Sequence, residues 1–449
     1  MTSDKMQKAL EPLILAWRVP ELRARILYVL GMVSIYVFAL HISVPEVNQE
    51  AMQKLLSSSA GVLSFLDIFS GGALGRVSIL ALGIMPYITA SIVFQVLTIA
   101  FPYFKELQKE GEYGRRKMAQ YTRWSAVGLT FIQAVIADRA FVQFGVIPAA
   151  WENQVVTVLA LTAGTMYLLW LGEQVTQKGI GNGISFIIFV GIVAALPKYL
   201  GALIEEGGHT LSMIFFLVLF VATVVVIVYV TQGERRIQVK YAPRQAGRRM
   251  VQAQRSYLPL KMAAAGVIPI IFAISIVLFP GQLATFYIQS LGQNVEGMGF
   301  KAGTFIQQIF APDHWFASLL YGLLVLLFTY FYTAVIFDVR DLSDNLKRYG
   351  GQIPGYAPGR PTQLFIDRVL TRITFAGGMF LAGIALLQWW APAILGLRGT
   401  GAQGISTLVG GTSLLIVVAV ALDIMQNLDQ QLKMRQYEGF AKQMGKGKL

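Results

Sequence analysis

The chain has 449 residues, of which 55% are hydrophobic and 14% charged, and this excludes a soluble protein because one core could not hide so much apolar surface. It has no cysteine, which excludes a disulfide framework, a thiolate nucleophile and an iron–sulfur site. The net charge of +13 would suggest nucleic-acid binding in a soluble protein, but the basic residues lie in loops between apolar stretches and indicate membrane orientation. His41, His209 and His314 are far apart in the chain, so we expect no metal site and no cofactor.

Windows of about 20 apolar residues predict ten membrane-spanning helices, and so an all-α polytopic membrane protein. In chain order they cover residues 26–43, 77–100, 122–144, 153–172, 183–203, 211–230, 264–287, 315–337, 370–391 and 408–428. The stretch 62–75, before the second span, is too short to cross and predicts a short, interrupted helix.

The basic residues are distributed unequally between the two sides of the membrane. Of the 37 lysines and arginines, 31 lie in the termini and loops of one side, five lie on the other, and Arg76 lies at the helix break. Because cytoplasmic loops carry the excess of basic residues, both termini are predicted to be cytoplasmic.

Ten spans with both ends on one side divide into two inverted halves of five spans around a central pore. We expect an N-terminal half at 1–205, a C-terminal half at 206–430 and a cytoplasmic tail at 431–449. Large cytoplasmic loops are expected at about 231–263 and 338–369. The sequence shows no residue-level repeat, so this symmetry follows from the number of spans and the topology alone.

Helix-breaking residues stand where the second span should begin. Residues 69–75 contain four glycines and serines, and Pro86 follows. A broken helix at membrane depth is tolerated only where protein or a water-filled cavity covers its freed backbone groups, so a pathway through the bilayer is predicted. Few ionisable residues lie within the spans, which favours a passive pore over an ion-coupled transporter. No Walker loop is present, and we expect no enzyme activity.

Five isoleucines lie beside helix breakers: Ile84, Ile88, Ile188, Ile271 and Ile416. Rings of apolar side chains gate pores by dewetting, so these residues are candidates for a constriction. For any one of them alone, a lipid-facing or core position is the simpler interpretation.

Ordered motifs run through most of the chain, at residues 69–95, 109–117, 164–174, 179–185, 245–249, 258–261, 266–269, 344–347 and 410–418. In these motifs and their order the chain resembles the SecY family. The resemblance implies a channel that translocates unfolded preproteins across the cytoplasmic membrane of a bacterium and releases membrane segments into it. It also implies the partners SecE, SecG, the motor SecA, the ribosome, preproteins with signal sequences, and anionic lipids.

The resemblance assigns roles to particular residues. The five isoleucines form the pore ring. Residues 62–75 form a plug, whose expected side chains and hinges are Leu63, Phe65, Leu66, Phe69, Gly71 and Gly72. A lateral gate between the second and third spans and the seventh and eighth is lined by Thr89, Gln95 and Phe279.

The cytoplasmic side receives two further assignments from the resemblance. Glu173 and Arg340 form an ion pair that biases the gate toward closure. The docking surface for SecA and the ribosome carries Arg244, Arg248, Arg249, Tyr356 and Arg360. The chain departs from the family here, because Pro243 replaces one residue of a basic pair and Ala357 stands at a usual arginine position, for which Arg360 is expected to compensate.

Two other functions fit the sequence pattern. An inverted-repeat secondary transporter of small solutes would need a polar binding site at the membrane midplane. A non-conducting membrane scaffold would show neither conductance nor translocation in reconstituted vesicles, even with the plug deleted.

Overall fold

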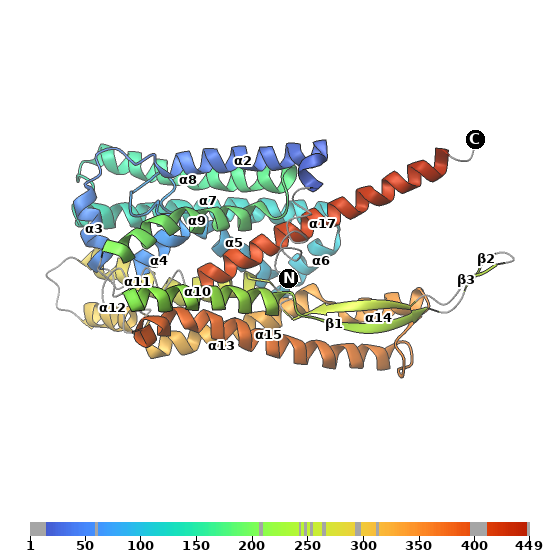
Figure 1. Ribbon diagram of the computed structural model, residues 1–449. Coiled ribbons are helices and arrows are strands. Elements are labelled where there is room, and N and C mark those ends of the chain that lie inside the picture. The colour runs from blue at the N-terminus through green and yellow to red at the C-terminus, as the bar shows by residue number, and fades with distance from the viewer. Residues whose placement is uncertain are drawn as a thin grey trace.

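The computed structural model describes residues 15–58, 62–205, 210–241, 244–246, 249–251, 255–262, 266–291, 298–310, 314–395 and 411–446. Long helices dominate the described part, and strands project from one end of the bundle (Figure 1). The predicted fold class is therefore correct for the membrane-embedded part, while the loops at 231–263 and 338–369 add strands that hydropathy did not predict.

The first half of the chain is helical throughout its long elements. These are α2 (Pro20–Leu40), α3 (Gln49–Ser58), α4 (Val62–Phe69), α5 (Met85–Ala100), α6 (Pro102–Lys109), α7 (Glu112–Gln143), α8 (Trp151–Lys178) and α9 (Gly183–Glu205). The second half contains α10 (Thr210–Thr231), α11 (Ile268–Leu291), α12 (Met298–Ile309), α13 (Trp315–Ile336), α14 (Val339–Arg348), α15 (Arg360–Leu395) and α17 (Thr412–Lys446).

Each predicted span overlaps one helix of the structure. Among the described residues, six helices are long and apolar enough to cross a membrane, and α5 with α6, bent by 98°, would make a seventh. Three shorter apolar helices lie at Gly183–Pro197, Leu217–Thr231 and Ile268–Gly281. The count of ten spans therefore stays a prediction, and the boundary between the two halves falls at residues outside the described part.

The second span begins later than predicted. Helix α5 starts at Met85 rather than near residue 77, because the preceding chain turns repeatedly. Val77 and Gly83 have positive φ angles of 48° and 57°, which no α-helix allows. Pro86 lies in the first turn of α5, where its missing N–H costs no helical hydrogen bond.

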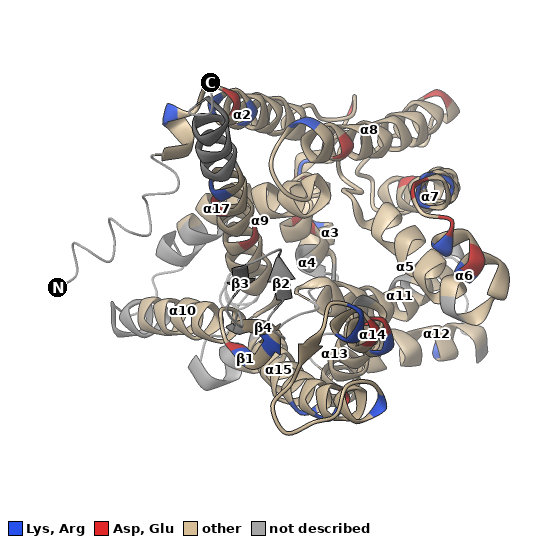
Figure 2. Cartoon of the chain, turned by 90° about the vertical axis from the view of Figure 1, so that its right-hand side faces the viewer, with Lys and Arg blue, Asp and Glu red and all other residues tan. Residues whose placement is uncertain are grey.

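The long helices form two groups, which meet at two seams. Helices α5, α7, α8 and α9 pack on their neighbours in the first half, and α10, α11, α13, α15 and α17 do so in the second. The groups touch where α9 meets α17 and where α5 and α7 meet α11. Viewed along the helices, α4 lies inside the circle that they form (Figure 2).

The projecting strands join two loops that are distant in sequence. β1 (Glu234–Tyr241) pairs antiparallel with β4 (Arg255–Lys261) along its length and with β5 (Gly351–Gln352) at Lys240 and Tyr241. β2 (Arg244–Ala246) and β3 (Arg249–Val251) form a separate hairpin farther out. A small apolar core beneath the sheet contains Ile237, Val239, Leu260, Leu346, Ile353 and Ile366.

Candidate functional site

All five predicted ring isoleucines are buried in one apolar cluster. Their exposed fractions run from 0% for Ile416 to 7% for Ile88 and Ile271. They come from the first turns of α5 and α11, from the residue before α5, and from the second turns of α9 and α17. The cluster therefore joins the two helix groups.

Two glycines set where helices α11 and α17 begin. Gly266 has a φ of 61° two residues before α11, which carries Ile271. Gly411 precedes α17 with a φ of 145°, and a Cβ there would lie 2.1 Å from the carbonyl oxygen of Ile384. Only glycine fits at position 411, so α17 starts at Thr412 and holds Ile416 inside the cluster.

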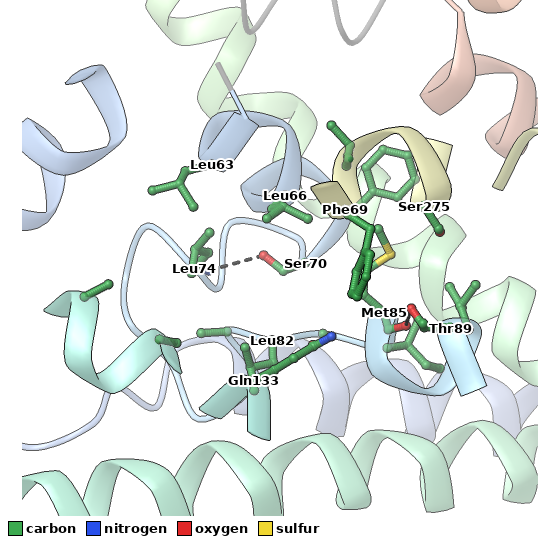
Figure 3. Close-up of a pocket in the computed structure, with 18 of the residues that line it drawn as sticks. Leu63, Leu66, Phe69, Ser70, Leu74, Leu82, Met85, Thr89, Gln133 and Ser275 are labelled. Atoms are coloured by element: carbon green, nitrogen blue, oxygen red, sulfur yellow. Dashed lines mark hydrogen bonds between the residues drawn. The ribbon is translucent and has the colours of Figure 1, made fainter. Parts of the chain in front are cut away.

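The predicted plug is a helix of eight residues, α4, inside the circle of long helices. Leu63, Leu66 and Phe69 point toward a cavity bordered by ring isoleucines (Figure 3). Phe69 also belongs to the ring cluster and is only 8% exposed. The side chain of Phe65 lies outside the described part of the structure.

A turn with left-handed glycines ends the plug helix. Gly71 and Gly72 have φ angles of 75° and 80°, which side chains other than glycine rarely adopt. A Cβ on Gly71 would lie 3.1 Å from the Gly191 Cα and 3.2 Å from the Tyr36 hydroxyl, whereas one on Gly72 would meet nothing within 4 Å. Of these two glycines, only Gly71 packs against α9 and α2, so it is the contact point of the plug hinge with these helices.

Buried polar groups also hold this turn, and the sequence analysis missed them. The Gly75 N–H donates to Asp67 Oδ1 at 2.7 Å, and Asp67 is 1% exposed. The Ser70 hydroxyl donates to the Asp67 carbonyl oxygen and accepts from the Leu74 N–H (Figure 3). One signal could have found Asp67, since it is the only charged residue in the apolar stretch 62–75.

A cavity of about 130 Å³ brings together residues of the ring, the plug and the predicted lateral gate. Its lining includes Ile84, Ile88 and Ile188 from the ring, Leu63, Leu66 and Phe69 from the plug, and Thr89 and Phe279 from the gate. The cavity lies beside the seam where α5 and α7 meet α11.

Both polar gate residues form hydrogen bonds within α5, and Gln95 also approaches α13. The Thr89 hydroxyl donates to the Met85 carbonyl oxygen at 3.1 Å, within α5. The Gln95 amide donates to Ser91 Oγ at 3.2 Å and lies within hydrogen-bonding reach of Tyr332 on α13. Thr89 thus faces the cavity, Gln95 lies two turns farther along α5, and Phe279 on α11 is 44% exposed.

Glu173 forms an ion pair with Arg123 in this structure, and its predicted pair with Arg340 stays a prediction. Glu173 Oε1 on α8 lies 2.5 Å from Arg123 Nε on α7. Helices α7 and α8 pack side by side in the first half, so this pair needs no contact across the pore mouth. Arg340 is exposed on α14, which follows α13 in the second half.

The predicted docking residues lie on the elements that project from one end of the helices. Arg244 and Arg249 are on β2 and β3, but their side chains, and the whole of Arg248, lie outside the described part. The Tyr356 ring stacks on Phe365 with centroids 4.2 Å apart. Arg360 is exposed at the first residue of α15. Among the described residues, no cluster of acidic or histidine side chains could hold a metal ion.

Comparisons with known proteins agree over most of the chain. A family model described as SecY matches residues 78–425. The protein translocase subunit SecY of Thermotoga maritima is 42% identical over 445 residues, which cover 97% of each protein. The protein translocase subunit SecY of Escherichia coli K12 is 40% identical over 432 residues, which cover 94% of each protein.

Solved structures share the fold at lower sequence identity. One described as the structure of a protein conducting channel has a TM-score of 0.59 and 17% identity, over 89% of this chain and 90% of that chain. Sec61 in a canine ribosome-channel complex from the endoplasmic reticulum has a TM-score of 0.58 and 17% identity, with the same coverage. From the family model and the two relatives, the chain belongs to the SecY family.

Proposed function

We propose that this protein-conducting channel is held closed by the five ring isoleucines and the plug, and opens sideways at the seam between α5, α7 and α11. It translocates unfolded preproteins across the membrane and releases membrane segments into the lipid. The observation that carries the proposal is the shared cavity, because ring, plug and seam side chains line one space. A substrate that enters it would contact all three.

Ring chemistry suits a seal that must also conduct a polypeptide. Branched apolar side chains exclude water and ions from a narrow constriction, and they fit around an extended chain without specific hydrogen bonds. The five isoleucines come from helices of both groups, so separation of the groups widens the constriction.

The seam is suited to opening because its polar contacts are weak. Interhelical hydrogen bonds in membranes contribute only about 0.6 kcal/mol on average. Thr89 satisfies its hydroxyl within α5, so it adds no latch to α11. A signal sequence that forms an apolar helix can therefore replace the contacts between α5, α7 and α11 at the seam with contacts of its own.

Energy for transport comes from partners that dock on the cytoplasmic loops. SecA and the ribosome bind the basic hairpin β2–β3 and the neighbouring loop around Tyr356 and Arg360. Support comes from the sheet, since β5 ties the two loops into one body. Adjacent arginines suit RNA phosphate, which gives ribosome binding a steep salt dependence.

The assembly completes this proposal. SecE and SecG accompany the chain in the cytoplasmic membrane of a bacterium, with both termini cytoplasmic and anionic lipids around it. The family assignment favours this channel over the small-solute transporter and the scaffold.

Reconstitution tests the proposed function. The chain is incorporated with SecE into proteoliposomes, SecA and ATP are added, and protease-protected preprotein is measured. We expect ATP-dependent import that is lost when the signal sequence is deleted. Binding of preprotein without any protected material would contradict the proposal.

A further inference from the structure

The plug contains one ionisable side chain, and it is buried at the hinge. Residues 62–75 include Asp67 and no other acidic or basic residue. Asp67 is 1% exposed, and its carboxylate accepts the Gly75 N–H across a turn of eight residues. A Cβ on Gly75 would lie 3.2 Å from both carboxylate oxygens, so the turn closes tightly around this group.

The backbone of Asp67 holds the same turn. Its carbonyl oxygen accepts from the Gly72 N–H at 2.7 Å and from the Ser70 hydroxyl at 3.0 Å. Asp67 therefore links the end of the plug helix to the chain beyond the hinge by both main chain and side chain. If the plug rotates about this hinge, the hydrogen bonds of Asp67 must either break or move together with the plug.

The hinge lies at membrane depth. Gly71 abuts Gly191, eight residues into α9 and about 12 Å along that helix at 1.5 Å per residue. It also abuts Tyr36, four residues before the end of α2. On its far side the turn meets Leu56 of α3, which follows the first span and lies toward the outer surface in the proposed orientation. Asp67 thus sits between the ring and the outer surface.

A charge at this depth experiences the membrane potential. We propose that Asp67 is a positioning residue that makes plug displacement voltage-dependent: its carboxylate fixes the closed hinge, and an inside-negative potential drives this negative charge outward with the plug. This inference rests on the proposed function of the plug. Moving one charge through about a third of a 100 mV potential changes the open-to-closed ratio roughly fourfold.

The neighbouring basic residue does not cancel this effect. Arg76 follows the hinge, and its carbonyl oxygen is the acceptor for the Gln49 amide of α3. The carbonyl oxygen of the next residue, Val77, accepts a hydrogen bond from the Val44 N–H, close to the end of the first span. Arg76 therefore belongs to the fixed frame, while Asp67 belongs to the segment that moves.

The test measures exposure of the plug to the outer solution. Because the chain has no cysteine, Leu63→Cys places one thiol on the plug. Proteoliposomes with the channel complex and a valinomycin-set potassium potential are labelled from outside with a membrane-impermeant maleimide. We expect the labelling rate to rise about fourfold when the lumen, which corresponds to the cytoplasm, is made 100 mV negative.

Three companion variants separate charge from structure. Asp67→Asn retains an oxygen for the Gly75 N–H but lacks the charge, so the voltage response should disappear. Ser70→Ala removes the bond to the Leu74 N–H and leaves the charge, so resting labelling should rise while the voltage response stays. Asp67→Glu retains the charge and should retain the response, which keeps the test decisive if Asp67→Asn assembles poorly.

The outcomes distinguish this inference from the plug itself. Addition of a synthetic signal peptide should accelerate labelling of Leu63→Cys in every variant. If the peptide has this effect but Asp67→Asn responds to voltage like the parent, the Asp67 inference is overturned and the plug stands. If the peptide leaves labelling unchanged, the plug assignment fails together with the inference.

Discussion

Ile416 is the most deeply buried of the ring isoleucines, with no exposed area. We expect Ile416→Asn to wet the ring, because an amide without a partner in an apolar site costs about 1–3 kcal/mol and favours hydrated, open arrangements. The resting ion leak of reconstituted channels should rise roughly tenfold, since about 1.4 kcal/mol changes an equilibrium by that factor.

The control for this variant is Ile416→Val, which shortens the side chain and keeps it apolar. Its leak should stay close to that of the parent. An unchanged leak in Ile416→Asn would remove Ile416 from the ring.

Glu173 offers a second test at the residue scale. Its partner is Arg123, and both side chains are partly exposed, so the pair should contribute only about 0–1 kcal/mol. Reversal of either charge should lower the midpoint of thermal unfolding slightly, and the double swap Arg123→Glu with Glu173→Arg should restore it. The matched double variant Glu173→Arg with Arg340→Glu should not restore the midpoint of thermal unfolding. Rescue by Arg340 instead of Arg123 would contradict the pairing seen here.

Single residues differed in how far the sequence could predict them. The ring isoleucines stand beside glycines and prolines, but this local signal made them only candidates, and the family resemblance was needed to group them as a ring. The bond from Asp67 to Gly75 depends on how the intervening turn folds, which no spacing rule supplies. Arg123 was missed because pairing between α7 and α8 depends on helix rotation, which the sequence leaves open.

At the scale of elements, two adjacent glycines in the plug hinge provide a matched pair of variants. Gly71→Ala and Gly72→Ala both place a side chain at a positive φ, which costs about 1–2 kcal/mol. Only Gly71→Ala also presses on Gly191 and Tyr36. The resting ion leak should therefore rise more in Gly71→Ala than in Gly72→Ala. Single-channel recording of the two variants side by side measures this difference. Equal leaks would mean that the hinge does not dock on α9 and α2.

The docking elements lead to a prediction about Arg360, which is exposed at the start of α15 beside Ala357. Arg360→Glu should slow SecA-driven translocation several-fold in proteoliposomes, because it reverses the charge proposed to compensate for Ala357. Ribosome affinity, which we propose to depend on β2–β3, should stay nearly unchanged.

Arg368→Glu, at an exposed position two turns farther along α15, is the control and should leave both activities intact. Normal translocation by Arg360→Glu would contradict the compensation. The same conclusion would follow if Ala357→Arg added activity whether or not Arg360 were present.

Elements with their own periodicity were predictable, and elements that need a distant partner were not. The long apolar helices follow from composition alone. The sheet β4–β1–β5 was missed because β1 alternates only two buried residues, Ile237 and Val239, and its partner β5 lies more than a hundred residues away. The late start of α5 escaped prediction because the apolar residues before Met85 continue the hydropathy signal although their backbone turns.

At the scale of the whole molecule, the arrangement of two helix groups explains how a largely apolar chain can conduct a polypeptide. The groups meet at α9 with α17 and at α5 and α7 with α11, and we propose that the second seam opens while the first one holds. The long apolar helices were predictable from hydropathy, while the count of ten spans and their orientation stay predictions. The position of the seam beside the plug does not follow from the sequence pattern, because it depends on the packing of helices from both ends of the chain, and only the family resemblance pointed to it.

Photocrosslinking of a stalled preprotein tests this account most directly. Crosslinkers replace Ile188 in the ring, Thr89 and Phe279 at the seam, and, as controls, the exposed Leu159 on α8 and Phe375 on α15. We expect the extended part of the preprotein to be captured from Ile188 and its signal sequence from Thr89 and Phe279, with little capture from the controls. Capture mainly from Leu159 or Phe375 would contradict the account.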